Sequence, residues 1–456
     1  MKFKIFLSIL LCKLSCSILR TLGKGGTALP GKIALFICKD ILRYVSSNVQ
    51  TVIITGTNGK TTTSRIIEKA FSESGLSYFS NKSGANLLSG IVTVFCLNSD
   101  MKGHNKYKYA IIECDEAAFR LVAEYIDVKC VLVTNIFRDQ LDRYGEITST
   151  LNLITEGINK CKDVTVCINA DCSLCSHIYS LTKKKILFFG VDTSIYQNII
   201  KEPKDALFCI KCQKPYSFDY VTYGHLGGFR CDACGYHRMD PYIRVSKIIS
   251  MDENSSDVQL FIGQNAYDVK VNLPGAHNVY NAVAAACVMK VFDIDENIIV
   301  RSLGSFECGF GRMEKMFLNG VATEIILVKN PAGFNQILNF LVNIHGEFVL
   351  AILLNDELAD GTDVSWIYDV YFEKLLSYQD NMKAIYVSGN RAHDMQVRLK
   401  YAGLDMNNVF ILKNTDKLFE KALSHGIPLY ITPTYTAMFD LRKKIAKKYG
   451  IKEFYE

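Results

Sequence analysis

The feature that most constrains the fold of this chain is the stretch "TVIITGTNGKTTT" at residues 51–63. An apolar run at 52–54 stops at a glycine-rich turn at 56–59, and a helical pattern begins after Lys60 and Thr61. A strand, a glycine loop and a helix N-terminus together form an anion site, because loose backbone N–H groups and the helix dipole both favour a phosphate there. The order of these segments predicts an α/β domain that binds a nucleotide.

Two side chains of this loop have the chemistry that a triphosphate requires. Lys60 would reach the β- and γ-phosphates, and the Thr61 hydroxyl would bind Mg²⁺. The full phosphate-loop pattern places a further glycine five residues before Gly59, where this chain has Ile54. A chance Gly-Lys-Thr at a helix start is the alternative, but the strand, loop and helix stand in the order that the mechanism needs.

Length and composition indicate a globular chain of several domains. The 456 residues correspond to about three domains. We expect an N-terminal helical segment at 1–45, an ATP-binding domain at 46–315 and a C-terminal α/β domain at 316–456. The net charge of +6 is compatible with an anionic substrate or a membrane surface. No arginine-rich arm or mixed basic-aromatic patch is present, so we expect no nucleic-acid partner.

Apolar runs and helical patterns alternate after the loop, which predicts a parallel sheet with right-handed crossovers. Strands are expected at 109–112 and 131–134, and in "VTVCINAD" and "KILFFGVD". Ligands of such sheets bind beyond the carboxyl ends of the strands. Glu113, just past the first of these strands, is therefore a candidate Mg²⁺ ligand, directly or through water. A solvated carboxylate at a strand end is the alternative.

Two cysteine pairs interrupt the alternation. Cys209-x-x-Cys212 and Cys231-x-x-Cys234 are separated by eighteen residues, which is the spacing of a zinc ribbon with four thiolate ligands. With all four positions filled by protein, the zinc would be structural, in an insertion at about 205–240 without a core of its own. Three further features of this region are expected to play no part in the metal site: His225, His237 and the single pair Cys172-x-x-Cys175.

Two polar features follow the insertion. His277 and Asn278 stand at the start of a helix rich in small residues, where they could cap the helix or contact a ligand. Arg312 lies among glycines in "FECGFGRMEKM", and an arginine on such a link can reach a phosphate or a ribose.

A second α/β alternation begins near residue 320. Its strand-end loops include an acidic one with Asp356, Asp360 and Asp363. Four carboxylates within 356–363 are more than a turn needs, although a solvated acidic loop remains the alternative.

The first nineteen residues, "MKFKIFLSILLCKLSCSIL", allow two interpretations. They resemble a signal peptide, but Lys13 interrupts the apolar run and no A-x-A cleavage site follows. They also fit an amphipathic helix, whose apolar face would comprise Ile5, Ile9, Leu10, Leu14 and Ile18. We favour the helix, with a targeting or anchoring segment as the alternative, and we expect no transmembrane helix. The sixteen cysteines of such a chain are expected to be reduced in the cytoplasm.

Four motifs in order resemble the Mur ligase family: "TGTNGKTT", "NIFRDQLDRYG", "GAHNVYNAVAA" and the arginine-bearing link. This resemblance implies a Mur-ligase-type parallel-sheet ATPase domain with a zinc-ribbon insertion, followed by a smaller α/β domain. The chain has only about fifty residues before the loop, a four-cysteine ribbon, and "LVKNPAGFNQ" at the start of the last domain. In these respects it is similar to the Mur-ligase-type subunits of lipid II isoglutaminyl synthase. Four further stretches resemble the same subunits: "GKGGTALPGKIA", "LNDELADGTDVSWIYDV", "SGNRAHDMQVRLKYAG" and "PTYTAMFDLR".

That resemblance implies a specific reaction. ATP would phosphorylate the α-carboxyl of D-glutamate in the stem peptide of lipid II, and ammonia would displace the phosphate to give D-isoglutamine. The chain has no G-x-C-x-G nucleophile elbow, and in this family a separate glutaminase, GatD, supplies the ammonia as partner in a heterodimer. A lipid-linked substrate implies a cytoplasmic protein, peripheral at the inner face of the plasma membrane.

The resemblance also implies residue roles. Lys60, Glu113 and Asp356 would be catalytic. Asp356 would act together with the Cys-His pair in the partner's active site, and its neighbours Asp360 and Asp363 are alternatives for this role. Mg²⁺ would be bound by Thr61 and Glu113. The ATP site would comprise Gly56, Thr57, Asn58, Gly59, Lys60, Thr61, Thr62, His277, Asn278 and Arg312. A carbamylated lysine, common in Mur ligases, cannot be placed.

Two other functions stay open on sequence alone. The first is a free-standing ligase of the Mur or folylpolyglutamate type that adds an amino acid. The second is a zinc-ribbon regulatory or nucleic-acid-binding protein that uses ATP as a switch, which would bind nucleic acid in a salt-sensitive manner.

Overall fold

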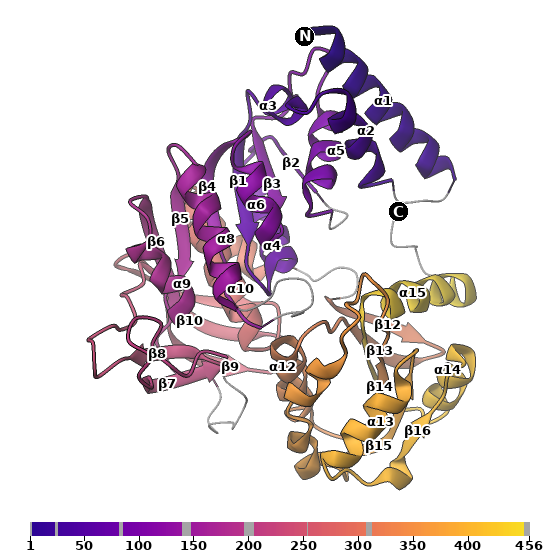
Figure 1. Cartoon of the computed structure of the whole chain (residues 1–456). Coiled ribbons are helices and arrows are strands. Elements are labelled where there is room, and N and C mark those ends of the chain that lie inside the picture. Colours follow the sequence, from indigo (N-terminus) through magenta and orange to yellow (C-terminus); the bar gives the residue numbers. More distant parts are fainter. Residues whose placement is uncertain are drawn as a thin grey trace.

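The computed structural model consists of two sheet domains and an N-terminal helical segment (Figure 1). It describes residues 2–22, 26–81, 85–138, 147–195, 205–252, 254–306 and 312–450, without the side chain of Arg312. Within these ranges no helix combines the length and apolar character that crossing a bilayer requires.

Among the described residues, the larger domain contains a sheet with the strand order β11-β10-β9-β6-β5-β4-β1-β3-β2 and a separate two-stranded sheet formed by β7 and β8. Its elements and those of the N-terminal segment are α1 (Lys2–Thr21), α2 (Leu29–Ile37), α3 (Ile41–Val45), β1 (Gln50–Thr55), α4 (Lys60–Glu73), β2 (Tyr78–Ser80), α5 (Leu88–Asn98), β3 (Tyr109–Glu113), α6 (Glu116–Val122), β4 (Asp127–Val133), α8 (Ile147–Lys160), β5 (Thr165–Asn169), α9 (Ser173–His177), η1 (Ile178–Ser180), β6 (Lys185–Val191), β7 (Ser217–Tyr223), β8 (Leu226–Arg230), β9 (Ile243–Met251), β10 (Ser256–Ile262), β11 (Asn265–Val271), α10 (Ala276–Val291) and α11 (Glu296–Gly304).

The smaller sheet has the order β12-β13-β17-β14-β15-β16. Its domain comprises β12 (Arg312–Leu318), β13 (Val321–Ile326), α12 (Pro331–Leu341), β14 (Phe348–Leu353), η2 (Ser365–Asp369), η3 (Phe372–Tyr378), β15 (Met382–Ser388), α13 (Ala392–Tyr401), η4 (Met406–Asn408), β16 (Val409–Ile411), α14 (Thr415–Leu423), β17 (Leu429–Pro433) and α15 (Tyr435–Tyr449). All its strand pairs are parallel except β12 with β13.

Strand β1 lies inside the larger sheet because its sequence suits burial on both faces. Val52, Ile53 and Ile54 are all fully buried. A strand that helices cover on both faces has a continuous run of apolar residues, whereas a half-buried strand alternates apolar and polar residues. β1 pairs in parallel with β3 and β4, so the ends of these three strands meet at one edge. The nucleotide loop leaves β1 at that edge.

The parallel sheet that the sequence predicts is confirmed, and two antiparallel strands extend it at one edge. β2, β3, β1, β4, β5, β6 and β9 run parallel, but β10 is antiparallel to both β9 and β11. Tight turns connect β9, β10 and β11, and a short turn permits only antiparallel pairing. The strand predicted at 109–112 is one residue longer, so Glu113 is the last residue of β3 and not the first residue beyond it.

The N-terminal helix α1 exists, but its buried face differs from the prediction. Ile5 and Ile9 are buried as expected, together with Cys12 and Cys16. Leu14 and Ile18, expected on the same face, are exposed. The chain has apolar residues on both sides of α1, so periodicity alone could not identify the side that packs against the protein.

Candidate active site

The loop between β1 and α4 is shaped by two glycines with left-handed backbone angles. Gly56 has φ +111°, and a Cβ there would lie 2.6 Å from the Thr134 Oγ1. Gly59 has φ +88°, and its Cβ would lie 2.2 Å from the Asn281 Oδ1. Any other residue would be strained and would clash with its neighbours. No side chain caps the N-terminus of α4, so its backbone N–H groups are available to an anion.

Asn135, two residues past the end of β4, holds the loop through hydrogen bonds. The Asn58 N–H donates to the Asn135 Oδ1 at 3.0 Å, and the Asn135 Nδ2 donates to the Asn58 carbonyl at 3.2 Å. The Thr57 N–H donates to the Asn135 carbonyl at 2.9 Å. Asn135 thus fixes the loop conformation from the end of the neighbouring strand, and it is the first residue of the motif "NIFRDQLDRYG".

Thr61 and Glu113 meet as the sequence predicted. The Thr61 hydroxyl donates to a Glu113 carboxylate oxygen at 2.7 Å. Asn81 fixes the backbone of Glu113 in both directions, accepting from its N–H at 2.9 Å and donating to its carbonyl at 2.8 Å. A hydroxyl and a buried carboxylate side by side offer the hard oxygen ligands that Mg²⁺ prefers.

Lys60 has a partner that the sequence analysis missed. Its ammonium lies 2.8 Å from a Glu116 carboxylate oxygen, and both side chains are largely buried. It also donates to the carbonyl of Gly56. Glu116 is the first residue of α6 and lies three residues after Glu113 in "ECDEAAF". A second carboxylate so close to a strand end was the available signal. Glu116 orients the Lys60 ammonium toward the loop.

Helix α10 closes the other side of the loop. Asn278 is buried near its start and donates from Nδ2 to the Pro274 carbonyl at 2.8 Å. The Asn281 Nδ2 donates to the Asn278 Oδ1 at 3.1 Å, and the Thr63 hydroxyl of α4 lies 3.4 Å from the Asn281 Oδ1. His277 lies partly buried one residue earlier, beside Gly275. The predicted pair therefore stands beside the loop, and Asn281, one turn further on, was missed.

The C-terminal domain reaches the same loop through an amide pair. Asn330 follows β13 and donates from Nδ2 to the Asn58 Oδ1 at 3.0 Å. It also caps α12, since its Oδ1 accepts from the Gly333 N–H at 2.8 Å. One buried side chain thus joins the start of a helix in the second domain to the nucleotide loop of the first.

The three aspartates of the acidic loop differ in their surroundings. Asp360 is buried and accepts from the Thr436 N–H at 2.8 Å. Asp363 accepts from the Ser365 N–H at 2.8 Å. Asp356 instead lies 3.1 Å from the Arg391 guanidinium and remains partly exposed. Two of the aspartates therefore hold the local backbone, and Asp356 presents an accessible carboxylate at the carboxyl edge of the smaller sheet.

Some predicted positions lie outside the described residues. They include the side chain of Arg312 and the part of "NIFRDQLDRYG" at 139–146. Arg312 itself begins β12, the first strand of the smaller sheet.

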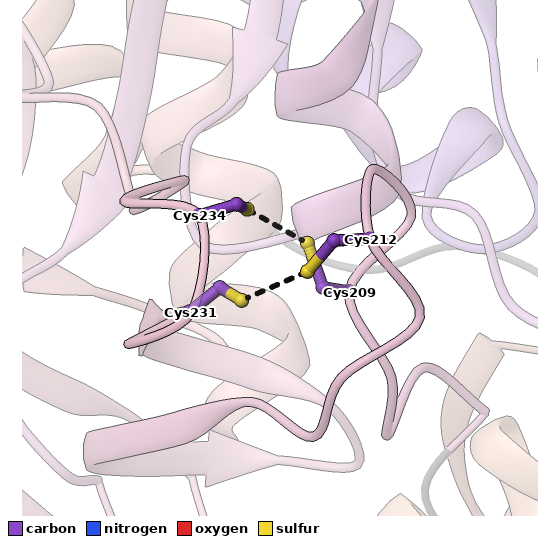
Figure 2. Close-up of side chains that lie close together, drawn as sticks. All are labelled: Cys209, Cys212, Cys231 and Cys234. Carbon is purple, nitrogen blue, oxygen red and sulfur yellow. Dashed lines mark hydrogen bonds between the residues drawn. The ribbon is translucent and has the colours of Figure 1, made fainter.

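The four cysteines of the insertion come together in the structure. Cys209 and Cys212 lie on one loop and Cys231 and Cys234 on another, with their sulfur atoms facing each other (Figure 2). The sulfurs lie within 4.8 Å of one another, at 3.6 Å for Cys209 to Cys234 and 3.4 Å for Cys212 to Cys231. Four thiolates around a zinc at about 2.3 Å would have sulfurs about 3.8 Å apart. The donor set and its spacing fit zinc.

The two cysteine loops share one backbone conformation. The N–H of the first cysteine in each pair bonds to a carbonyl five residues on, Cys209 to Lys214 and Cys231 to Tyr236, both at 2.7 Å. Such paired turns orient two sulfurs toward one point. Contrary to the prediction, the insertion has a small core of its own, in which three aromatic residues surround the cysteines: Tyr216, Phe229 and Tyr236.

The insertion is tied to the main sheet by a buried ion pair. The Arg238 Nε lies 2.5 Å from the Asp171 carboxylate, which also accepts from the Val191 N–H at 2.8 Å and from the Tyr280 hydroxyl. Burial raises the pKa of Asp171, and the Arg238 charge opposes that rise. Since Tyr280 belongs to α10, one carboxylate links the ribbon to the helix beside the nucleotide loop.

The remaining sulfur and histidine features are separate from the four-cysteine cluster. His225 is fully buried, and its Nε2 lies 3.5 Å from the Cys172 sulfur. Cys172 caps α9 and Cys175 lies within it, both buried. Among the described residues, the four cysteines are the group of three or more His, Cys, Asp or Glu side chains whose ligand atoms lie close enough together to hold a metal, and this group contains no histidine.

Known proteins share this fold, and two family models match the sequence. Residues 54–224 match the Mur ligase middle domain and residues 327–438 match the MurT ligase C-terminal domain. Among solved structures, a pseudomurein peptide ligase type C from Methanothermus fervidus has a TM-score of 0.65 at 21% identity, covering 90% of this chain and 81% of that one. The MurF ligase of Thermotoga maritima in complex with ADP has a TM-score of 0.61 at 15% identity, covering 91% and 85%.

The fold and the loop define a Mur ligase type of protein, a class whose fold implies ATP and Mg²⁺. Over its whole length, the chain is 32% identical to the lipid II isoglutaminyl synthase (glutamine-hydrolyzing) subunit MurT of Streptococcus pneumoniae, covering 98% of each chain. The chain belongs to the MurT family. The relative is named as a subunit, which implies that it works with a partner.

Proposed function

We propose that this chain is the ATP-dependent subunit of a lipid II isoglutaminyl synthase. It would amidate the α-carboxyl of D-glutamate in the stem peptide of lipid II, with ammonia from a glutaminase partner of the GatD type. The full-length similarity to a subunit of that name supports this proposal most directly. The loop, the Thr61–Glu113 pair and the uncapped start of α4 provide matching chemistry.

The residues of the loop have separate tasks in this reaction. The loop N–H groups and the Lys60 ammonium bind the triphosphate and stabilise the charge that develops as the γ-phosphoryl group leaves ADP. Mg²⁺, held by Thr61 and Glu113, would neutralise phosphate charge. His277, Asn278 and Arg312 would hold the nucleotide. The α-carboxylate oxygen attacks the γ-phosphorus, and the O–P bond to ADP breaks, giving an acyl phosphate.

Ammonia then attacks the acyl carbon, and the C–O bond to phosphate breaks to leave the amide. At neutral pH ammonia is mostly ammonium, which has no lone pair to attack with. Release of ammonia from glutamine at a partner's site would supply the unprotonated nucleophile directly. We assign Asp356 to the partner, because Asp360 and Asp363 accept from backbone N–H groups of their own domain, whereas the partly exposed Asp356 pairs with the Arg391 side chain. The four-cysteine ribbon would hold structural zinc.

The decisive experiment is co-expression with the glutaminase partner, followed by an assay on lipid II with glutamine and ATP. Amidation makes the precursor about one dalton lighter, whereas the addition of an amino acid would make it far heavier. A heavier product would show a free-standing Mur or folylpolyglutamate type of ligase. Salt-sensitive binding of nucleic acid without any ATP-dependent product would show a regulatory protein instead.

A further inference from the structure

The positive charge of this chain is concentrated at its N-terminus. Residues 1–45 contain eight lysines and arginines and one aspartate, whereas residues 46–456 contain 44 basic and 45 acidic residues. The net charge of +6 therefore comes from the N-terminal segment, and the rest of the chain is close to neutral. Such an asymmetry indicates a local attraction to an anionic surface rather than a property of the whole protein.

Helix α1 has a second apolar face that no part of the described structure covers. Ile5, Ile9 and Cys12 pack against the protein. On the opposite side, apolar side chains recur every three or four residues from Phe3 (73% exposed) to Ile18 (58% exposed), and all of them are exposed except the half-buried Leu10. A helix at the surface of a globular protein normally has polar residues there.

Helix α2, which packs against α1, continues this exposure. Phe36 is 91% exposed, and Leu29 lies exposed two turns earlier on the same side of α2. In Figure 1, α1 lies on the outer side of α2 and α5, at the edge of the molecule. We call these exposed residues the N-terminal apolar face: Phe3, Phe6, Leu14, Ile18, Leu22, Leu29 and Phe36.

Exposed cations accompany this face. Six described basic side chains of the segment are exposed, and four of them lie on α1 or α2: Lys2, Lys4, Arg20 and Lys32. Lys13 is different, because it donates to the Ser99 carbonyl and helps to hold α1 in place. A second copy of this chain on the same face would bring like charges together. Anionic lipid headgroups would instead neutralise them while the apolar side chains enter the acyl boundary.

We propose that α1 and α2 dock this chain onto an anionic lipid bilayer through the N-terminal apolar face. At 20 residues, α1 is about 30 Å long. It lies on the bilayer rather than across it, since its other face is packed against the protein and Lys13 bonds to Ser99. The inference extends the proposed function, because a lipid-linked substrate would be met at this same surface.

The test uses the full chain and vesicles without lipid II. Sedimentation with phosphatidylglycerol–phosphatidylcholine vesicles should show binding that falls with salt, and vesicles of phosphatidylcholine alone should bind far less. The double variant Phe3→Glu, Ile18→Glu should lower the partition onto anionic vesicles at least tenfold. Lys32→Gln should lower it about fivefold, as expected for one cation near such a surface. Phe317→Glu, at a side chain 75% exposed on the C-terminal domain, is the matched control and should change nothing.

Several results would overturn the proposal. They are absent or equal binding of the wild-type chain to the two kinds of vesicle, and unchanged binding by the double variant. A wild-type dimer that the double variant converts to a monomer, without vesicle binding, would show self-association instead. The salt and lipid dependence of the wild type needs no variant, so a poorly folded variant does not spoil the test. Amidation of a soluble substrate fragment is measured separately, so failure here leaves the proposed reaction standing.

Discussion

At the scale of single residues, the site depends on charges held in fixed positions before any ligand arrives. Glu116 holds the Lys60 ammonium, and Asn81 holds the backbone of Glu113. Groups placed in advance need no reorganisation during the reaction, which is why they stabilise a transition state more than mobile groups do. The predicted catalytic residues can therefore be tested one at a time.

We expect Lys60→Ala and Glu113→Ala each to lower amidation by about 10²–10³-fold, since each removes a charge that acts on the transferred phosphoryl group. Both variants should still fold, with a lower unfolding temperature for Lys60→Ala, which removes the cation from the largely buried Glu116 carboxylate. The rate of glutamine-dependent amidation of lipid II is the measurement. Lys69→Ala serves as the control on the same helix, because Lys69 pairs only loosely with Glu73 at 3.8 Å. Near-normal turnover in either of the first two variants would refute their roles.

Replacing Asp356 should lower amidation with glutamine but not amidation with free ammonia. Asp356→Asn should lower amidation with glutamine by at least about 10²-fold, as expected for loss of a group that orients a partner's general base. Amidation with free ammonia should stay close to normal. Asp363→Asn, in the same loop, should leave both rates unchanged because Asp363 serves the Ser365 backbone. An equal loss with both nitrogen sources would place the role of Asp356 elsewhere.

At the scale of elements, the ribbon is a small hairpin built around the four-cysteine cluster. Its core is limited to three aromatic rings beside the cysteines. A unit this small gains much of its stability from metal binding. The Arg238–Asp171 pair transmits its position to Tyr280 on α10, so the state of the ribbon should affect the helix beside the loop.

We therefore expect Cys231→Ser to remove zinc and to reduce solubility and the unfolding temperature before it affects the chemistry itself. Metal analysis should find one zinc per wild-type chain and none in the variant. Cys38→Ser, at a partly exposed cysteine outside the ribbon, should keep both zinc and stability. A stable, active variant without zinc would contradict a structural role.

At the scale of the whole molecule, two domains share one site. The nucleotide loop belongs to the larger sheet, and Asn330 brings the smaller sheet against it. Besides this amide pair, an exposed Arg138–Asp369 pair at 3.5 Å also joins the two domains, but such a pair contributes little. The amide contact therefore offers the sharper test of how the domains cooperate.

Asn330→Asp keeps the oxygen that caps α12 but removes the Nδ2 donor to Asn58. The change also places a negative charge in a buried position against the Asn58 Oδ1, which costs more than the loss of a neutral hydrogen bond. Amidation should therefore fall at least about 10-fold, because this charge also repels a triphosphate bound at the loop. The unfolding temperature should fall only slightly, because the helix cap is retained and the two domains can separate to hydrate the carboxylate. Asn343→Asp, an exposed change just past the same helix, is the control. A drop in unfolding temperature that matches the loss of activity would assign Asn330 to stability alone.

The sequence by itself determined the features that depend on residues close together in the chain. The glycine loop, the start of α4 and the two cysteine turns were predicted because their geometry is set by a few consecutive residues. The tertiary structure alone decided contacts between distant residues. Lys60 meets Glu116 across 56 positions, Asn58 meets Asn135 across 77 and Asn330 across 272. It also decided which side of α1 is buried, since both sides are apolar and only the packing of α2 and α5 distinguishes them.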